Sequence, residues 1–308
     1  MLHHLKNPRR WHALLASKGL LNWMSDDAFL KLAFRMKMGQ KLNLKKPRTF
    51  NEKLQWLKLH DRKPLYTQLA DKYDVRQFVE ETIGQDYLIP LVGGPWDSFD
   101  EIDFDALPEK FVLKCTHDSG GLVVCRDKAA LNKEKAREKI EKSLQRNFFT
   151  ISREWPYRDI PPKIIAEQYM EDENPALGLT DYKFFCFNGE PKLLYVSEGL
   201  ENHATAKISF FDMEGKLMPF HRSDFAPMSE ETRMPDSMPQ MAQIAEKLAR
   251  QVDCPFVRID LYSICGKIYF SEVTFFPCGG MLPFSPAHWD DILGQWIKLP
   301  FEQESSKK

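Results

Sequence analysis

The pattern of apolar and polar positions divides the chain into a helical first part and a strand-rich remainder. Before residue 85, apolar residues recur at helical spacing. This spacing predicts short helices within 11–44, a helix at 49–60 capped by Thr49 or Asn51, and one amphipathic helix from Pro64 to Gly84. From Phe111 onward, the period shortens to two and β-branched or aromatic residues dominate. Strands are expected at 110–115, 121–125, 163–170, 182–187, 191–197, 206–211, 255–262 and 267–275, with helices at 128–147 and 238–251.

Antiparallel hairpins separated by helices favour an α+β fold over a doubly wound sheet. A chain of 308 residues can build a core without disulfides or a structural metal. Its six cysteines are scattered and form no Cys-x-x-Cys pair, so they are interpreted as reduced thiols, which suits the cytosol. No stretch approaches the roughly 18 apolar residues of a membrane span, and none has the pattern of a signal peptide. We therefore expect a soluble cytoplasmic protein.

Charge is distributed unevenly along the chain. The first 50 residues hold eleven Lys or Arg and two Asp, a net charge of +9, which leaves −10 for the remainder of a chain whose total is −1. A basic arm attracts anions, so we expect it to approach the phosphates of a lipid-linked glycan or the anionic inner face of the cell membrane. The alternative is a set of short helices that only packs on the domain with a solvated basic face. No nucleic-acid partner is expected.

A Gly-rich turn between two apolar strands is the first candidate for chemistry. Residues 110–124 read KFVLKCTHDSGGLVV, with Lys114 ahead of the turn and Gly120 and Gly121 at its tip. Residues without Cβ let several backbone N–H groups approach one anion, and Lys114 adds a positive charge. Together they predict a phosphate cradle. The alternative is an ordinary exposed hairpin, because the stretch matches neither the P-loop nor the dinucleotide-binding pattern.

Two acidic residues on neighbouring strands form the second candidate. The period of two places residues of each strand on a common face: Arg258, Asp260 and Tyr262 on the first, and Ile268, Phe270, Glu272 and Thr274 on the second. Asp260 and Glu272 are then neighbours that repel each other, and a divalent cation such as Mg²⁺ would resolve the repulsion. In the alternative, Asp260 pairs with Arg258 or with a basic residue distant in sequence, and Glu272 is exposed.

A third set of residues follows the apolar strand that begins at residue 163. The strand ends in Glu167, Gln168, Tyr169 and Met170, whose backbone would suit an adenine edge. Asp181 and Lys183 share one face of the next strand and would suit a ribose hydroxyl and a phosphate. Taken alone, an acidic loop with an edge lysine is more often plain solvated surface.

The order of these features along the chain resembles the ATP-grasp superfamily from Lys72 to Gly280. Six segments narrow the resemblance to the TupA-like ATP-grasp family of bacterial polysaccharide biosynthesis: TFNEKLQWLKLHDR, LADKYDVRQFV, FVLKCTHDSGG, DYKFFCFNGEPK, FVRIDLY and WIKLP. The resemblance covers nearly the whole chain. It implies an ATP-grasp fold, in which two α+β lobes with antiparallel sheets clasp ATP.

The resemblance also implies roles for the residues that bind the nucleotide. Lys72, expected on a helix, and Lys114, expected on a strand, would contact the phosphates of ATP. A mobile flap over the phosphates would consist of Asp118, Ser119, Gly120 and Gly121. The adenine hinge, the ribose contact and a further phosphate contact would fall to Glu167 through Met170, to Asp181 and to Lys183.

The metal ligands implied by the resemblance are Asp260 and Glu272, which would bind Mg²⁺ or, in its place, Mn²⁺. Thr274 stands where many ATP-grasp enzymes have Asn. A second metal ion would therefore gain a hydroxyl in place of an amide oxygen, which leaves open whether one ion or two are bound.

The catalytic residues implied by the resemblance surround the transferred phosphoryl group. Arg258 would steady that group together with Lys114. Gly279 and Gly280 match a glycine turn whose backbone N–H groups face the reacting carboxylate, which adds Gly280 to the catalytic set.

Five segments are expected along the chain. They are a basic helical arm at 1–48, a helical region on the substrate side at 49–110, a small lobe with the flap at 111–170, a large lobe with the metal site at 171–301, and a flexible tail at 302–308.

The reaction implied is the activation of a carboxylate as an acyl phosphate, which an amine then attacks. The carboxylate would belong to a small molecule or to a lipid-linked glycan, in the biosynthesis of a capsule, an O-antigen or a teichuronopeptide-type polymer. Two alternatives stay open. The same carboxylates would serve a phosphotransferase or a metal-dependent glycosyltransferase, and Thr274 would fit a relative that binds glycan or membrane without catalysis.

Overall fold

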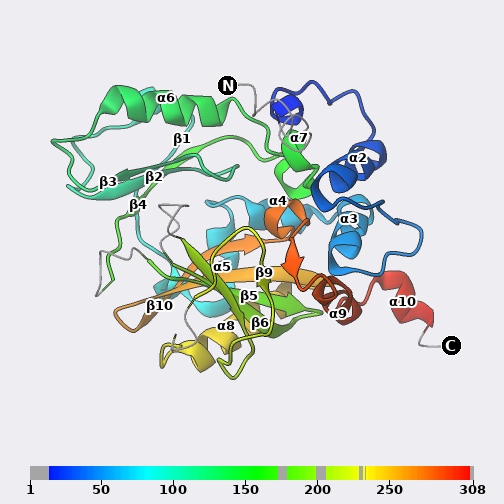
Figure 1. Cartoon of the computed structure of the whole chain (residues 1–308). Helices are drawn as coiled ribbons and strands as arrows, with labels where there is room; N and C mark the ends of the chain where they lie inside the picture. The colour runs from blue at the N-terminus through cyan, green and yellow to red at the C-terminus, as the bar shows by residue number, and fades with distance from the viewer. Residues whose placement is uncertain (1–13, 173–178, 199–205, 229–231, 233, 306–308) are drawn as a thin grey trace.

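Two antiparallel sheets with helices packed on them organise the chain (Figure 1). A computed structural model describes residues 14–172, 179–198, 206–228, 232 and 234–305. The four-stranded sheet has the order β1-β4-β2-β3, and the five-stranded sheet has the order β10-β9-β5-β6-β7. The expected α+β class is confirmed.

The four-stranded sheet consists of β1 (Leu91–Trp96), β2 (Phe111–Cys115), β3 (Leu122–Cys125) and β4 (Ile164–Gln168). Helix α6 (Lys133–Leu144) lies across it and buries Ala136 and Ile140 against the strands (Figure 1). The five-stranded sheet consists of β5 (Asp181–Phe187), β6 (Glu190–Glu198), β7 (Lys207–Phe211), β9 (Phe256–Ile264) and β10 (Lys267–Thr274). Helix α8 (Met238–Val252) packs on one of its faces.

The remaining helices surround these two sheets. They are α2 (Asp26–Met38), α3 (Phe50–His60), α4 (Pro64–Ala70), α5 (Val75–Ile83), α7 (Phe149–Ser152), α9 (Trp289–Trp296) and α10 (Pro300–Ser305). A short strand pair joins β8 (His221–Arg222) to β11 (Phe284–Ser285). In the part of the chain that the structure describes, no helix has the length and apolar character that crossing a membrane requires.

Local sequence explains where the long elements begin and end. The side chain of Thr49 accepts a hydrogen bond from the backbone of Glu52, and Glu52 returns one to Thr49, which forms the capping box expected for α3. Ser25 caps α2 at its start, and Gly39 ends it in the left-handed region at φ +76°. All eight strands expected from the sequence are present, with ends that differ by at most two residues.

Alternation along the strands of the large sheet separates an aromatic core from the polar face. Phe50 of α3 packs edge-on against Phe256 at 4.9 Å between ring centroids and also contacts Phe185, Phe187 and Phe284. Since these rings come from α3, β5, β9 and β11, one side chain joins the helical first part of the chain to the large sheet.

Several expectations about element boundaries are wrong. The helix from Pro64 to Gly84 is two helices, because the Asp71 carboxylate accepts the N–H groups of Tyr73 and Asp74 and turns the chain. Lys72 therefore lies in a turn, where its backbone N–H donates to the Thr116 carbonyl at 3.1 Å.

The boundary expected at residue 110, between the helical region and the small lobe, divides one sheet. The edge strand β1 at 91–96 lies before this boundary but pairs with β4, which lies after it. Its sequence, LVGGPW, does not predict a strand, because Gly and Pro are poor strand formers. A Cβ on Gly94 would lie 2.7 Å from the Ile164 carbonyl oxygen, so the close approach of β4 requires glycine there. The expected tail at 302–308 is helical up to Ser305, and its last three residues lie outside the described part, as do residues 1–13 of the arm.

We expect Phe50→Ala to lower the free energy of unfolding by about 3–5 kcal/mol, because the removed ring leaves a cavity among four other aromatic rings. Leu20→Ala is the control, since Leu20 is 56% exposed, and it is expected to change stability by less than about 0.5 kcal/mol. Urea unfolding followed by tryptophan fluorescence measures both. Equal stability of the two variants would contradict the role given to Phe50.

Candidate functional site

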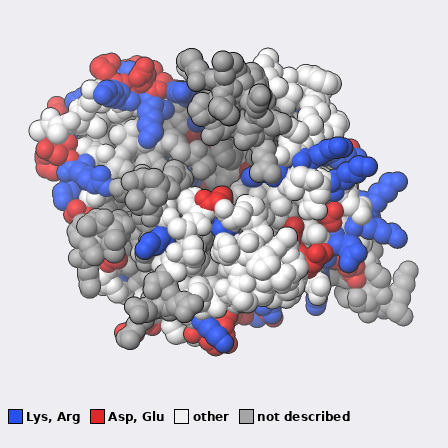
Figure 2. Space-filling model, in the orientation of Figure 1, with Lys and Arg blue, Asp and Glu red and all other residues white. Residues whose placement is uncertain are grey.

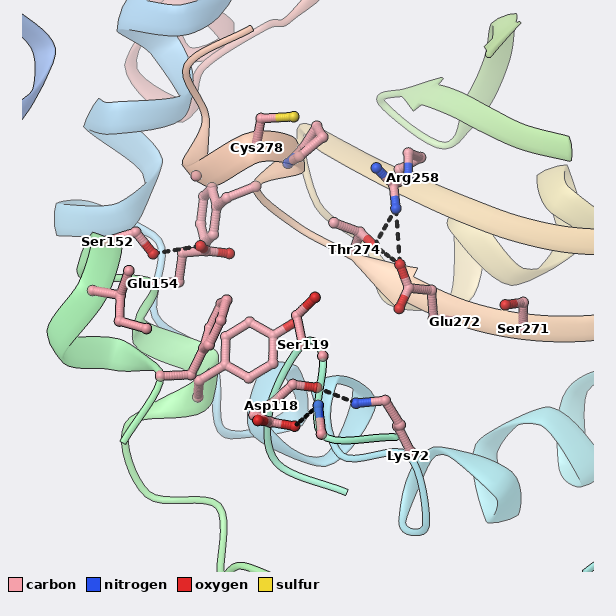
Figure 3. A pocket seen from close by; sticks show the side chains of 18 of the residues that line it. Lys72, Asp118, Ser119, Ser152, Glu154, Arg258, Ser271, Glu272, Thr274 and Cys278 are labelled. Carbon is pink, nitrogen blue, oxygen red and sulfur yellow. Dashed lines mark hydrogen bonds and ion pairs between the residues drawn. The ribbon is translucent and has the colours of Figure 1, made fainter. Parts of the chain in front are cut away.

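A cavity of about 1080 Å³ lies between the two sheets, and Figure 3 shows its interior. Small-ligand sites commonly measure about 300–1,000 Å³, so this one has room for a nucleotide and a second substrate. Its wall includes ten of the residues assigned from the sequence: Lys72, Lys114, Asp118, Ser119, Gly120, Gly121, Glu167, Arg258, Glu272 and Thr274.

Strands β9 and β10 place the expected acidic pair side by side. In the register of the two strands, Glu272 lies opposite Asp260 and Thr274 lies opposite Arg258. Directly opposed residues of an antiparallel pair share a face of the sheet. The expected neighbourhood of Asp260 and Glu272 is therefore confirmed.

A bulge at Ser271 produces this register. The pairing shifts between Phe270 and Glu272, so that Phe270 lies opposite Leu261 on the other face of the sheet. Ile268 and Phe270 thus do not share a face with Glu272 and Thr274, and that expectation is wrong. A strict period of two cannot reveal a bulge.

Arg258 links the two acidic side chains. Its guanidinium donates to both oxygens of Asp260 at 2.7 Å and to Glu272 Oε1 at 2.8 Å. It also donates to the Thr274 hydroxyl at 3.0 Å (Figure 3). Lys183 donates to Asp260 Oδ2 at 2.9 Å from the neighbouring strand β5. The charge of the fully buried Asp260 is therefore compensated by two cations, as in the alternative in which it pairs with Arg258.

Glu272 is the acidic residue of this pair that the cavity reaches. Its side chain is 42% exposed, compared with 0% for Asp260. Desolvation alone would raise its pKa, but Arg258, Lys183 and Lys72 together lower the pKa of Glu272 to about 2. Glu272 is thus an anion throughout the neutral pH range.

The oxygen atoms of Asp260, Glu272 and Thr274 form a donor set of the kind that Mg²⁺ prefers. Within the described ranges, no group of three or more His, Cys, Asp or Glu side chains gathers as metal ligands. An ion at this position would complete its shell with water and phosphate oxygens, which suits Mg²⁺. The residues fit that ion, with Glu272 open to the cavity and Asp260 enclosed by Arg258 and Lys183.

The Gly-rich turn is held in place by side chains below it. Lys72 donates from Nζ to the carbonyl oxygen of Asp118. The Asp118 carboxylate accepts from the Gly121 N–H at 3.2 Å and from the Ser143 hydroxyl. A Cβ on Gly121 would lie 2.2 Å from Ser143 Oγ, so packing requires this glycine. Gly120 has φ +102° and open space around it, which leaves it as the glycine that an anion can approach.

Lys114 and Glu167 form an ion pair on the wall of the small sheet. Lys114 Nζ lies 2.5 Å from Glu167 Oε2, and Arg76 of α5 lies 3.5 Å from Glu167 Oε1. Both cations line the cavity. An anionic ligand that binds Lys114 would therefore compete with the Glu167 carboxylate for this lysine. The adenine contact expected at Glu167 uses its backbone and does not need its side chain.

Seven residues assigned from the sequence do not line the cavity in the described part of the chain: Gln168, Tyr169, Met170, Asp181, Lys183, Asp260 and Gly280. Tyr169 accepts a hydrogen bond from Arg126 at 2.9 Å at the end of β4. Lys183 and Asp181 form an ion pair at 3.2 Å beside Asp260. The backbone N–H of Gly280 donates to carbonyls of its own turn, at Phe276 and Pro277. Its expected N–H contact with a substrate stays a prediction, and in this arrangement the N–H group is already paired within the turn.

Sequence reasoning missed the end of the cavity that α2, α7 and the following turn build. The wall there contains Lys37, Ser152, Glu154, Tyr157 and Asp224. Glu154 is buried, and the hydroxyl of Ser152 donates to its Oε1 at 2.5 Å (Figure 3). The only signal was the charged Arg-Glu pair ahead of Trp-Pro-Tyr at 153–157.

Lys58 lies directly behind this end of the cavity. It is fully buried and donates to the carbonyl oxygens of Ser152 at 2.8 Å and Gly279 at 2.7 Å. Burial lowers the pKa of Lys58 to about 7. The side chain ties the start of the 152–157 segment to the turn at 277–280.

Comparison with known proteins agrees with the expected family. The family model described as TupA-like ATPgrasp matches residues 52–298. No curated protein matches the chain at a significant level.

Several solved structures with a similar backbone are described as ligases. A D-alanine–D-alanine ligase from Bacillus anthracis matches with a TM-score of 0.41 and 15% identity, over 78% of this chain and 62% of that chain. The same enzyme in complex with ATP gives 0.45 and 12%, over 78% and 69%. An L-amino acid ligase from Bacillus licheniformis gives 0.45 and 14%, over 91% and 63%. These likenesses concern the fold alone, and the chain spans about three fifths of the length of the first and the last of these proteins.

We expect Asp260→Asn to lower the free energy of unfolding by about 3–5 kcal/mol, because it leaves Arg258 and Lys183 buried without their shared anion. Glu272→Gln is the control on the opposite strand, and its partly exposed site predicts a loss below about 1 kcal/mol. Thermal or urea unfolding at pH 7 measures both variants. A loss for Asp260→Asn no larger than that of the control would contradict the compensation described above.

Proposed function

This chain belongs to the TupA-like ATP-grasp family, and we propose that it is a ligase that uses ATP to join a carboxylate to an amine. The observation that carries this proposal is one cavity whose wall combines Lys72, Lys114 and Arg258 with the exposed Gly120. The carboxylate oxygen would attack the γ-phosphorus and release ADP. The amine would then attack the acyl carbon, and the bond to the phosphate oxygen would break.

The cations of the cavity would act by electrostatic stabilisation. During transfer, negative charge spreads over the phosphoryl oxygens, and fixed positive groups at that place lower the barrier. Two of these cations have internal partners that a triphosphate would replace. Lys72 would leave the Asp118 carbonyl, and Lys114 would leave the Glu167 carboxylate.

Mg²⁺, or Mn²⁺ in its place, would be held by Glu272. Thr274 lies next to Glu272 on the same face of the sheet, and Asp260 lies deeper, away from the cavity. When bound, the ion would neutralise phosphate charge. Glu272 keeps its negative charge for this purpose because the neighbouring cations hold its pKa low.

We place the reaction in the synthesis of a bacterial surface polysaccharide. The support is the family resemblance, and the volume of the cavity leaves room for a sugar carboxylate next to a nucleotide. A uronic acid or an amino acid unit on a lipid-linked glycan would fit this role, which would put the protein in the cytoplasm beside the inner face of the cell membrane.

The basic arm supports a second proposal, a peripheral contact with an anionic membrane. Three apolar side chains at its start are exposed, Leu14 by 45%, Leu20 by 56% and Trp23 by 82%, and Lys18 lies among them. Figure 2 shows further Lys and Arg gathered over α2 and the segment that follows it. Such a combination is typical of segments that lie on anionic bilayers.

The arm is also part of the domain. Helix α2 buries Phe29, Leu30, Ala33 and Phe34, and it contributes Ala33, Met36 and Lys37 to the cavity wall. This packing supports, for α2, the alternative in which the arm packs on the domain. Removal of the whole arm would open the cavity, so the membrane contact has to be tested by substitutions at exposed positions.

The ligase reaction is tested by ADP release with D-glucuronate, N-acetyl-L-glutamate or N-acetyl-D-alanine, each combined with ammonia or ethanolamine. We expect ADP release from ATP only when a carboxylate and an amine are both present. Lys72→Met is expected to reduce kcat/KM by about 10²- to 10³-fold, because it removes a fixed charge from the phosphates. Lys192→Met, at an exposed position on β6, is the control and is expected to match the wild type.

Other outcomes of this assay would favour the alternatives. Consumption of a nucleotide sugar without ATP would indicate a glycosyltransferase. A phosphorylated product that is stable without an amine would indicate a phosphotransferase. Binding of ATP without ADP release for any pair of carboxylate and amine would favour the alternative of a relative without catalytic activity.

The membrane contact is tested by sedimentation with vesicles that contain phosphatidylglycerol. We expect the double variant Leu20→Ser, Trp23→Ser to bind about tenfold more weakly than the wild type, and added salt to weaken binding of both. Phe301→Ser, at an exposed apolar position on α10, serves as the control. Equal binding of all three proteins would remove the arm from any membrane contact.

A further inference from the structure

Glu154 is a buried carboxylate on the cavity wall that the proposed phosphoryl transfer does not use. It is 5% exposed, and its Oε1 accepts a hydrogen bond from the Ser152 hydroxyl at 2.5 Å. Among the residues that the structure describes, no cation lies within ion-pair distance of it. A buried carboxylate without such a partner is costly, unless a ligand supplies the positive charge.

Three separate elements fix the position of Glu154. Arg153, which precedes it, has φ +55° and lies 3.3 Å from Asp26 at the start of α2. Lys58 of α3 holds the Ser152 carbonyl together with that of Gly279. A non-glycine residue in the left-handed region persists where its surroundings hold it there. The carboxylate is therefore kept at the cavity wall by contacts with α2, α3 and the turn at 277–280.

The turn at 277–280 lies next to the Glu154 carboxylate, and Gly279 and Glu154 both line the cavity. A Cβ on Gly279 would lie 3.8 Å from Glu154 Oε1 and 3.3 Å from Ser152 Cβ. Arg258, which the proposed function places at the transferred phosphoryl group, lines the same cavity and is near enough to act electrostatically on Glu154. A group held by Glu154 would thus be next to the activated acyl carbon.

We propose that Glu154 binds the ammonium group of the amine substrate and accepts a proton from it. The inference rests on the proposed ligase function. An ammonium offers three N–H donors to an unpaired carboxylate, whereas the carboxylate substrate would be repelled by Glu154 and would suit Lys37 and Arg258. Proton transfer to Glu154 leaves a neutral amine with a free electron pair. The amine forms the new C–N bond, the C–O bond to phosphate breaks, and the second proton of the nitrogen leaves with the phosphate, which departs as HPO₄²⁻.

The charges around Glu154 agree with this role. Burial raises the pKa of Glu154 above the usual carboxyl range, although Lys58, the Ser152 hydroxyl, Lys37 and Arg258 act in the opposite direction. Tyr157 is the further titratable group that faces it. A base whose pKa approaches the working pH accepts a proton more effectively than an ordinary carboxylate.

The test compares two nucleophiles on the most active carboxylate of the panel. Hydroxylamine is uncharged at neutral pH and traps an acyl phosphate as a hydroxamate, while ethanolamine is an ammonium that must lose a proton. In Glu154→Gln we expect hydroxamate formation within about threefold of the wild type, but coupling to ethanolamine slower by about 10²- to 10⁴-fold. Glu141→Gln on the surface of α6 is the matched control for loss of a carboxylate and is expected to match the wild type with both nucleophiles.

The pH dependence gives an independent readout. Glu154 must be ionised to accept the proton, so kcat/KM for ethanolamine is expected to rise as pH increases through its raised pKa, and Glu154→Gln is expected to lose this step. Ser152→Ala removes a hydrogen bond that lowers the pKa of Glu154, and should move the step to higher pH. An unchanged profile in Glu154→Gln would overturn the proposal, as would an equal loss with both nucleophiles.

Binding is measured separately from turnover. In the presence of ADP, ethanolamine hydrochloride is expected to raise the Tm of the wild type above that in equal KCl, but not the Tm of Glu154→Gln. An equal rise in both proteins, or no rise in the wild type, would overturn the ammonium site. If the wild type instead shows this rise but gives neither hydroxamate nor ADP, the ligase function fails while the ammonium site stands.

Discussion

The guanidinium of Arg258 is the interaction on which the floor of the cavity depends. It joins β9 to β10 through Asp260, Glu272 and Thr274, in a place where only 8% of the residue is exposed. Buried charges of this kind are stable only as a compensated set. Lys183 completes the set from β5, and Glu272 remains the member that a ligand in the cavity can reach.

The cavity combines two halves that different parts of the chain build. The half near the Gly-rich turn contains Lys72, Lys114 and Gly120 and offers positive charge and open backbone. The other half contains Glu154 and Lys37, and among the described residues the Glu154 carboxylate has no cation within ion-pair distance. Arg258 and Glu272 come from the large sheet. Lys72 comes from the turn between α4 and α5, and Lys114 comes from the small sheet. A reaction in two stages, first on a phosphate and then on an acyl group, fits this division.

The sequence predicted most of the fold and one half of the site, and the reasons are physical. Alternation and capping are local, so the strands and α3 could be located from neighbouring residues alone. The bulge at Ser271 and the strand LVGGPW depend on pairing with other strands, which no local pattern contains. The break at Asp71 is local, because its carboxylate accepts the N–H groups of Tyr73 and Asp74, but the helical spacing of apolar residues on both sides of it conceals the turn. Glu154 was missed because its burial results from contacts with α2, α3 and the 277–280 turn. The roles of Gln168, Tyr169 and Met170 stay predictions, since these residues lie away from the described cavity wall.

Helix α2 forms part of the cavity wall, yet it precedes the matched family region, which begins at residue 52. The end near the Gly-rich turn is built from inside that region, while Lys37 and the Asp26 contact to Arg153 come from outside it. If the proposed function holds, a different leading helix would change the end of the cavity near Glu154 and leave the proposed phosphate contacts in place. Divergence in the choice of acceptor would then proceed by replacement of a single peripheral segment, leaving the energy-supplying machinery unchanged.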